Sequence, residues 1–172
     1  MALTAMRGMV PKRIWKPLEN MELRYTIAAR LHLLHKWSCP WDSESVPSTA
    51  YIGAYGELVA ASFLRAQGVK VLRRNWRWGK RGELDLVCRH GDTLVAVEVK
   101  SATGHRSGAP MRMVNASKRR LLRVGLLNWL RLLHPQEDIK TRFDVVEVYL
   151  APNSRPEVHW HQKVFTFAEG KS

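Results

Sequence analysis

Residues 82–100 read GELDLVCRHGDTLVAVEVK, and this stretch limits the fold more than any other part of the chain. Aliphatic and β-branched residues alternate with other residues on both sides of Gly91-Asp92, a dipeptide typical of a tight turn. The pattern predicts an antiparallel hairpin in which His90 pairs with Thr93 through a type II′ turn, with Gly91 first. The charged residues that interrupt this apolar hairpin are Glu83, Asp85, Glu98 and Lys100.

Side chains alternate between the two faces of a strand, so position parity assigns each residue to a face. Glu83 and Asp85 share one face of the first strand, and Glu98 and Lys100 share one face of the second. We expect each strand to have one apolar side. These sides consist of Leu84, Leu86 and Cys88 on the first strand, and of Val95, Val97 and Val99 on the second.

The two-residue turn also predicts which residues face one another across the hairpin. It sets Asp85 opposite Glu98 and Glu83 opposite Lys100. Facing Cβ atoms lie about 4.5–5.5 Å apart, and like charges directly opposite each other are destabilising. One interpretation is a solvated strand face with a Glu83–Lys100 ion pair. The other is a divalent-metal site, because carboxylate oxygens are the ligands that Mg²⁺ prefers.

The charge of the chain favours a negatively charged partner. Its 172 residues carry a net charge of +13, and the sequence pI is about 10.4. Such a balance is expected of a protein that contacts nucleic acid. Basic residues cluster in 65–81 and 99–136, and both ranges lack acids. The chain is strongly basic, yet Glu83, Asp85 and Glu98 lie in one hairpin. This concentration of acids favours the metal site over a solvated strand face.

Several other classes of protein are disfavoured. Cys39 and Cys88 are too few and too far apart to suggest a disulfide framework or a zinc site. No apolar run approaches ~18 residues, so we expect no membrane partner. The first residues do not form a signal peptide, which makes the cytoplasm the expected compartment.

The chain divides into two parts. Residues 1–48 are expected to form a basic N-terminal extension, either a poorly ordered arm or one that includes an amphipathic helix over about 22–37; residues 49–172 form the main domain. The pattern in that domain predicts a helix capped by Ser48 or Thr49 and ended at Gly68, a strand at 69–78, the hairpin, a helix over about 114–134, and strands at 142–150 and 157–167. This order, α-β-β-β-α-β-β, predicts an α/β domain with a mixed central sheet of about five strands flanked by helices.

Taken together, these segments resemble the PD-(D/E)xK nuclease core, and the stretch from Gly53 to about Phe167 is similar to the YraN-type family of bacterial endonuclease-like proteins, related to archaeal Holliday-junction resolvases. The matching segments are GxxGE at 53–57, RNWR at 74–77, GELDL at 82–86, VEVK at 97–100, Lys118 with its basic neighbours, and RFDVV at 142–146. The resemblance implies a restriction-endonuclease-like core and metal-dependent endonuclease activity on DNA, including branched or repair and recombination intermediates.

The resemblance also implies roles for particular residues. Asp85 and Glu98 would bind the metal ion with help from the Val99 carbonyl, Lys100 would be the motif lysine, and Glu57 matches the helix acid that often completes the site. The implied cofactor is Mg²⁺, with Mn²⁺ able to substitute. A Mg²⁺ ion held by carboxylates activates water and stabilises the negative charge of the transition state. The cation of Lys100 would also stabilise charge that develops on the phosphate.

Basic residues near these segments are expected to bind the nucleic acid, most simply DNA. They are Arg74, Arg77, Arg81, Arg106, Lys118, Arg119, Arg120 and Arg123. A homodimer is a further expectation, since cutting both strands usually needs two sites. Two alternatives stay open: a non-catalytic DNA or RNA binder on the same scaffold, and a basic adaptor that docks on an acidic protein.

Other residues allow a structural and a functional interpretation. Trp76 and Trp78 lie among basic residues and could stack on unpaired bases or pack in the core. Asp144 is interpreted as the structural partner of a nearby arginine, with a role in the site as the alternative. His159 and His161 share one strand face, where a surface pair is favoured over a transition-metal site.

Overall fold

The computed structural model describes residues 38–45, 47–79, 82–104, 114–133 and 138–167. These residues contain α2 (Thr49–Ala66), β1 (Lys70–Trp78), β2 (Gly82–His90), β3 (Thr93–Thr103), α3 (Ala116–Leu133), β4 (Lys140–Leu150) and β5 (Glu157–Phe165). The predicted order of elements is confirmed.

The strands form one mixed five-stranded sheet in the order β1-β2-β3-β4-β5. Neighbouring strands are antiparallel except β3 and β4, which run parallel. A parallel pair needs a crossover connection, and the segment that contains α3 provides it. The expected α/β fold with a mixed central sheet is therefore confirmed. None of the helices that the structure describes is long and apolar enough to cross a membrane.

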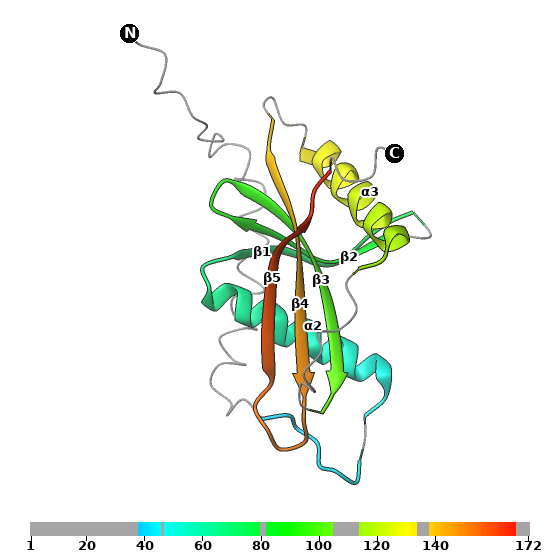
Figure 1. The fold of residues 1–172 in the computed structure, drawn as a ribbon, viewed down its shortest axis with the longest axis vertical. Coiled ribbons are helices and arrows are strands. Elements are labelled where there is room, and N and C mark those ends of the chain that lie inside the picture. Colours follow the sequence, from blue (N-terminus) through cyan, green and yellow to red (C-terminus); the bar gives the residue numbers. More distant parts are fainter. Residues whose placement is uncertain (1–37, 46, 80–81, 105–113, 134–137, 168–172) are drawn as a thin grey trace.

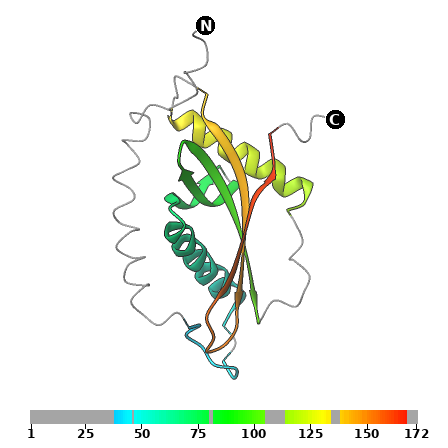
Figure 2. The ribbon, with the colours of Figure 1, turned by 60° about the vertical axis from the view of Figure 1, so that its left-hand side comes forward.

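The two helices cover opposite faces of the sheet. Val95 and Val97 on β3 pack in the core cluster beneath α2, whereas Leu94 and Ala96 on the same strand pack in the cluster beneath α3. Alternate residues of a strand point to opposite faces, so the sheet carries a core on each side. Figure 1 shows α3 across the upper part of the sheet and α2 across the lower part, and Figure 2 shows α2 alongside the long strands.

Helix α2 begins and ends where its sequence predicts. The Ser48 side chain accepts a hydrogen bond from the Tyr51 backbone N–H and so caps the first turn. The helix ends at Ala66, two residues before Gly68, whose φ is +78°. A residue in this left-handed conformation commonly terminates a helix, and glycine adopts it without strain.

The segment before α2 contributes to the core. Cys39 and Trp41, which lie in the predicted N-terminal extension, are 1% and 8% exposed. The Cys39 backbone N–H donates a hydrogen bond to the Ser154 carbonyl in the connection between β4 and β5. Residues 1–37, including the helix expected over 22–37, lie outside the described residues.

The hairpin has the predicted register as far as it is paired. His90 pairs with Thr93, and the ladder runs from there to the pair Leu86–Val97. Gly91 has φ +62°, as the first central residue of a type II′ turn requires. Beyond Val97, β3 pairs only with β4, whereas β2 continues with β1 as far as Gly82.

The strands β2 and β3 therefore separate, and we call this point the β2–β3 fork, with Asp85 on one branch and Glu98 and Lys100 on the other. Figure 1 shows β1 and β2 crossing the direction of the long strands β3, β4 and β5.

The expected apolar side of β2 is wrong at one residue. Leu86 and Cys88 pack beneath α2, but Leu84 packs beneath α3. Asn75 lies opposite this part of β2, between the pairs Arg74–Leu86 and Trp76–Leu84, and has φ +49°. The extended backbone of β1 is therefore interrupted beside the point where the alternation of β2 fails.

Candidate active site at the β2–β3 fork

Asp85 lies where the β2–β3 ladder ends. Its Oδ2 atom accepts a hydrogen bond of 2.8 Å from the Val99 backbone N–H, so a side chain replaces the next main-chain bond of the ladder. Burial, followed by the nearby charge of Glu98, raises the pKa of Asp85 to about 7. The two carboxylates predicted to converge are thus close enough for the charge of Glu98 to raise the pKa of Asp85.

Glu98 is the most buried acid at the fork, with 3% of its surface exposed. Lys100 Nζ lies 2.8 Å from its Oε1 atom, and Lys118 Nζ lies 2.8 Å from its Oε2 atom. Lys100 follows on the same strand, whereas Lys118 comes from the first turn of α3. A carboxylate with so little access to water needs such partners, because an unpaired buried charge is strongly destabilising.

The position of Lys118 depends on how α3 begins. Asn115 Oδ1 accepts a hydrogen bond of 2.9 Å from the Lys118 backbone N–H and caps the helix. Burial alone would lower the pKa of Lys118, but the Glu98 carboxylate, with the charges of Asp85 and Glu83, outweighs this effect and holds the pKa above its ordinary value. Lys118 is therefore a charged member of the site.

Glu57 reaches the site because α2 approaches β3 closely. A Cβ atom on Gly56 would lie 1.8 Å from Ser101 Oγ, so only glycine permits this approach. Arg74 lies 3.7 Å from Glu57 Oε2. Burial raises the pKa of Glu57, and its charge contributes to the raised pKa of Asp85. Glu57 on α2 is thus close enough for its charge to affect Asp85 at the fork.

Neither cross-strand pairing predicted at the fork belongs to the β2–β3 ladder, which ends at Leu86–Val97. Asp85 lies beside Glu98 through its hydrogen bond to the Val99 N–H, but the predicted pairing of Glu83 with Lys100 is wrong. Glu83 instead faces Arg77 across β1 and β2, with Arg77 Nε 3.2 Å from Glu83 Oε1. Lys100 is left to pair with Glu98.

The donor set fits a hard divalent cation. Asp85, Glu98 and Glu57 supply only carboxylate oxygens, which suit Mg²⁺ or Mn²⁺. Oε2 of Glu57 is buried and accepts no hydrogen bond within the described part of the chain, although Arg74 Nη2 lies 3.7 Å away. As the side chains stand, no three His, Cys, Asp or Glu residues within the described ranges are placed to hold a metal ion. At Glu98 the positive charge comes from Lys100 and Lys118.

Most of the basic residues expected to bind nucleic acid contact the protein itself. Arg74 pairs with Glu57, Arg77 with Glu83 and Lys118 with Glu98. Arg119 donates to the Val114 carbonyl, Arg123 donates to the Thr166 carbonyl, and both guanidinium groups lie over the Phe165 ring. Arg120 is exposed. Arg81 and Arg106 lie outside the described residues.

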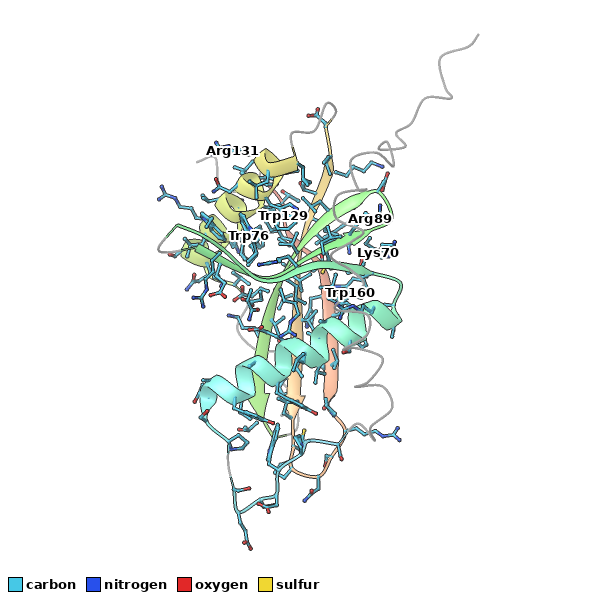
Figure 3. The ribbon with its side chains drawn as sticks, turned by 180° about the vertical axis from the view of Figure 1, so that it is seen from behind. Lys70, Trp76, Arg89, Trp129, Arg131 and Trp160 are labelled. Atoms are coloured by element: carbon cyan, nitrogen blue, oxygen red, sulfur yellow. The ribbon has the colours of Figure 1, made fainter. Side chains whose placement is uncertain are left out.

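Trp76 and Trp78 pack against the core beneath α3. Their rings stack with centroids 5.4 Å apart, and Trp76 makes an edge contact with Trp129 of α3 at 5.2 Å. Figure 3 shows Trp76 and Trp129 together between β1 and α3. A Cβ atom on Gly82 or on Gly125 would meet the Trp78 ring within 2.5 Å. The core interpretation of both tryptophans is the one that these contacts support.

Asp144 has the structural role that its sequence context suggests. It is 1% exposed and accepts two short hydrogen bonds from Arg142, with Nε to Oδ1 at 2.8 Å and Nη2 to Oδ2 at 2.9 Å. Trp160 Nε1 donates to the same carboxylate at 2.9 Å, and the Lys163 backbone N–H donates at 3.1 Å. This network ties β4 to β5 on the face covered by α2.

His159 and His161 lie on one face of β5 but have separate partners. His159 Nε2 is 2.6 Å from Glu157 Oε1, and His161 Nε2 is 3.3 Å from Glu147 Oε2. Each histidine is matched with its own carboxylate.

Sequence comparison places this geometry in a family. The model of the uncharacterised protein family UPF0102 matches residues 56–148, more than half of the chain. The chain belongs to UPF0102. This family is the YraN-type group whose motifs the sequence carries, and the match includes Glu57, Asp85, Glu98, Lys100 and Lys118.

Curated UPF0102 proteins from several bacteria are similar to the chain. The UPF0102 protein of Nocardia farcinica is 42% identical over 115 residues, which is 66% of this chain and 88% of that protein. The UPF0102 protein of Symbiobacterium thermophilum is 43% identical over 115 residues, 66% of this chain and 95% of that protein. The UPF0102 protein of Beutenbergia cavernae is 46% identical over 97 residues, 56% of this chain and 80% of that protein.

The place of Lys118 in the site was not predicted from the sequence. Lys118 was expected to bind nucleic acid, whereas in the structure it pairs with Glu98. Lys118 lies twenty positions after Glu98 in the chain, and residues 105–113 between them have no regular sequence pattern from which their meeting could be predicted. The only available signal was the Asn115 cap, which sets where α3 begins.

Proposed function

We propose that this UPF0102 protein is a divalent-metal-dependent nuclease that hydrolyses phosphodiester bonds in DNA, including branched or repair and recombination intermediates. The observation that carries the proposal is the convergence of Asp85 and Glu98 with the ammonium group of Lys100 at the fork. An exposed charged strand face would leave these acids solvated. Here Glu98 is buried and its neighbour Asp85 has a pKa of about 7.

The residues at the fork divide the chemistry between them. Asp85 and Glu98, with Glu57 beside them, would hold Mg²⁺ or Mn²⁺, and the Val99 carbonyl is a further oxygen donor. When bound, such an ion activates water and stabilises charge on the phosphate. Lys100 brings a cation to within 2.8 Å of Glu98, so its ammonium group can contact a phosphate oxygen as negative charge develops.

The charge of the protein supports a nucleic-acid substrate. The net charge is +13, and exposed or partly exposed cations lie on β1 and on the first turns of α3 beside the fork. Cations that neutralise phosphates release counterions, which makes such binding strong at low salt. The proposed partner is therefore DNA.

A non-catalytic DNA or RNA binder is the second candidate. It is favoured by one observation, namely that both Glu98 oxygens already have a lysine partner at 2.8 Å. A scaffold that no longer binds metal would keep such ion pairs permanently. Its affinity for nucleic acid would be steeply salt-dependent and indifferent to Mg²⁺.

The deciding experiment measures cleavage of supercoiled plasmid, single-stranded DNA and a four-way junction by the full-length protein, with Mg²⁺ or with EDTA. We expect Mg²⁺-dependent cleavage of at least one substrate. Lys100→Met should reduce the rate by about 100-fold or more, the order seen when a group that stabilises transition-state charge is removed. Its binding to the same DNA should change little.

Arg155→Met is the matched control. It removes the same positive charge, at a residue that is exposed in the connection between β4 and β5. Its cleavage rate should equal that of the wild type. Absence of cleavage on all three substrates, together with Mg²⁺-independent binding, would favour the non-catalytic candidate. Cleavage by Lys100→Met at the wild-type rate would exclude the assigned role of Lys100.

A further inference from the structure

Lys100 and Lys118 both pair with Glu98, but they interact differently with Asp85. Lys100 contacts Glu98 from the same strand, two residues on. Lys118 contacts the other oxygen of Glu98 and also interacts with Asp85, since its charge lowers the pKa of Asp85 while Asp85 raises that of Lys118. Lys118 is thus the amine that acts on both carboxylates. A divalent cation held by both acids would compete with Lys118 for the same two negative charges.

The two acids cannot accept a divalent ion without losing a partner. Glu98 is 3% exposed, and each of its oxygens lies 2.8 Å from an ammonium group. Adding a doubly charged ion would place three cations around one buried carboxylate, and like charges at such separations repel strongly where water is scarce. One ammonium group must therefore move away.

Lys118 has the freedom to leave. Its side chain is 31% exposed and that of Lys100 is 37% exposed, so each ammonium group has a route to water, and the interaction with Asp85 is what distinguishes Lys118. Its backbone is held independently, because Asn115 caps the first turn of α3 and Leu122 buries the next turn in the core. The side chain can swing out without disturbing the helix that carries it.

We propose that Lys118 is the resident counter-ion of Asp85 and Glu98, and that a divalent cation binds at the fork by displacing its ammonium group. This inference rests on the metal site of the proposed function. It gives that site an internal competitor, which weakens metal binding while keeping the carboxylates together when metal is absent. The displaced ammonium group stays tethered beside the site, where a phosphate oxygen can be its new partner.

The test measures binding of Mg²⁺ alone to the full-length protein by isothermal titration calorimetry at pH 8.5, above the pKa of about 7 at Asp85. Lys118→Met removes the charge and keeps the length of the side chain. We expect it to bind Mg²⁺ about tenfold more tightly than the wild type. Lys118→Arg should bind Mg²⁺ as weakly as the wild type, because it restores a cation.

Arg131→Met is the matched control, since Arg131 is exposed in the last turn of the same helix, as Figure 3 shows. It removes one positive charge without touching the fork and should leave the Mg²⁺ affinity within about twofold of the wild type. If Lys118→Met binds Mg²⁺ no more tightly than Arg131→Met, the inference is overturned.

Thermal unfolding gives a second readout that needs no catalytic activity. In EDTA, Lys118→Met should melt at a lower temperature than the wild type, because the buried Glu98 loses an ion-pair partner and Asp85 loses a nearby positive charge. Saturating Mg²⁺ should raise its melting temperature more than it raises that of the wild type. An equal rise in both proteins would contradict displacement.

These outcomes separate the inference from the proposed function. Tighter Mg²⁺ binding by Lys118→Met with no cleavage of any DNA would retain the displacement and remove the nuclease. Failure of the wild type and of Lys118→Met to bind Mg²⁺ would overturn both. Equal Mg²⁺ affinity in the two proteins, with cleavage intact, would overturn the displacement alone.

Discussion

The carboxylate of Asp85 accepts a hydrogen bond from the Val99 backbone N–H at 2.8 Å, at the point where β2 leaves β3. Main-chain pairing between these strands ends at Leu86–Val97. A separated strand leaves backbone N–H groups that need partners, and here an acid from the departing strand supplies one. The bond holds Asp85 next to Glu98 while the rest of β2 turns away, so the division of the sheet creates the site.

The stability of the protein should depend on the ionisation of Asp85. Its pKa is raised from 3.8 to about 7 in the folded protein, by burial and then by Glu98. Between about pH 4 and pH 7 the folded state therefore holds a proton that the unfolded chain has released. The free energy of unfolding in EDTA should fall as pH rises through this window. Denaturant unfolding at pH 4, 5.5 and 8 measures the fall.

Asp85→Asn should abolish this contribution, because asparagine does not ionise, and it keeps an oxygen that can accept from Val99. At pH 8 in EDTA the variant should be more stable than the wild type. Mg²⁺ should stabilise the wild type at pH 8 and leave the variant nearly unchanged. Glu44→Gln is the control, since Glu44 is exposed in the segment before α2. A pH slope in Asp85→Asn equal to that of the wild type would show that another group is responsible.

Gly56→Ala should destabilise the protein and displace Glu57. The added Cβ would meet Ser101 Oγ at 1.8 Å and Ser101 Cβ at 2.7 Å, so α2 has to move away from β3. Overpacking of this kind costs about 1–3 kcal/mol. Urea unfolding of the purified variant measures the loss.

Ser101→Gly in the same chain should recover part of that loss, because it removes both clashing atoms. Gly53→Ala is the control, since a Cβ there meets nothing within 4 Å. If Gly56→Ala and Gly53→Ala are equally stable, the close approach of α2 does not position the helix.

Asp144→Asn should be among the most destabilising single substitutions. The buried carboxylate balances Arg142 and accepts from Trp160 and Lys163. Loss of its charge leaves Arg142 without its ion-pair partner, and breaking a buried pair in this way costs about 3–5 kcal/mol. Chemical denaturation should show that loss. DNA cleavage per folded molecule should stay the same, and a selective loss of cleavage would instead place Asp144 in the site.

Trp78→Ala should reduce stability and leave nucleic-acid affinity nearly unchanged. The ring lies against Trp76 and over Gly82 and Gly125, so truncation leaves a cavity and costs about 3 kcal/mol. Affinity for single-stranded DNA, measured at a temperature where the variant is folded, should stay within about twofold. A base stacked on the ring would make truncation cost about 1–3 kcal/mol of binding, which fluorescence anisotropy would detect.

Local pattern was enough to predict much of this protein. The caps of α2, the turn at Gly91 and the alternation of β3 each depend on residues close together in sequence, and all three have the predicted form. The pairing of His90 with Thr93 follows from the turn, so the hairpin register was also predictable. The convergence of Asp85 with Glu98 was an extrapolation of that register by one pair.

Only the tertiary structure decided where that extrapolation stops. The β2–β3 ladder ends after Leu86–Val97. Beyond this point Glu83 pairs with Arg77, and Leu84 packs beneath α3. Register can be extrapolated only while two strands stay hydrogen-bonded, and no local sequence pattern at the fork predicts where β2 and β3 separate. The pairing of Lys118 with Glu98 likewise requires α3 to pack on the sheet, a contact between distant segments that no local pattern encodes.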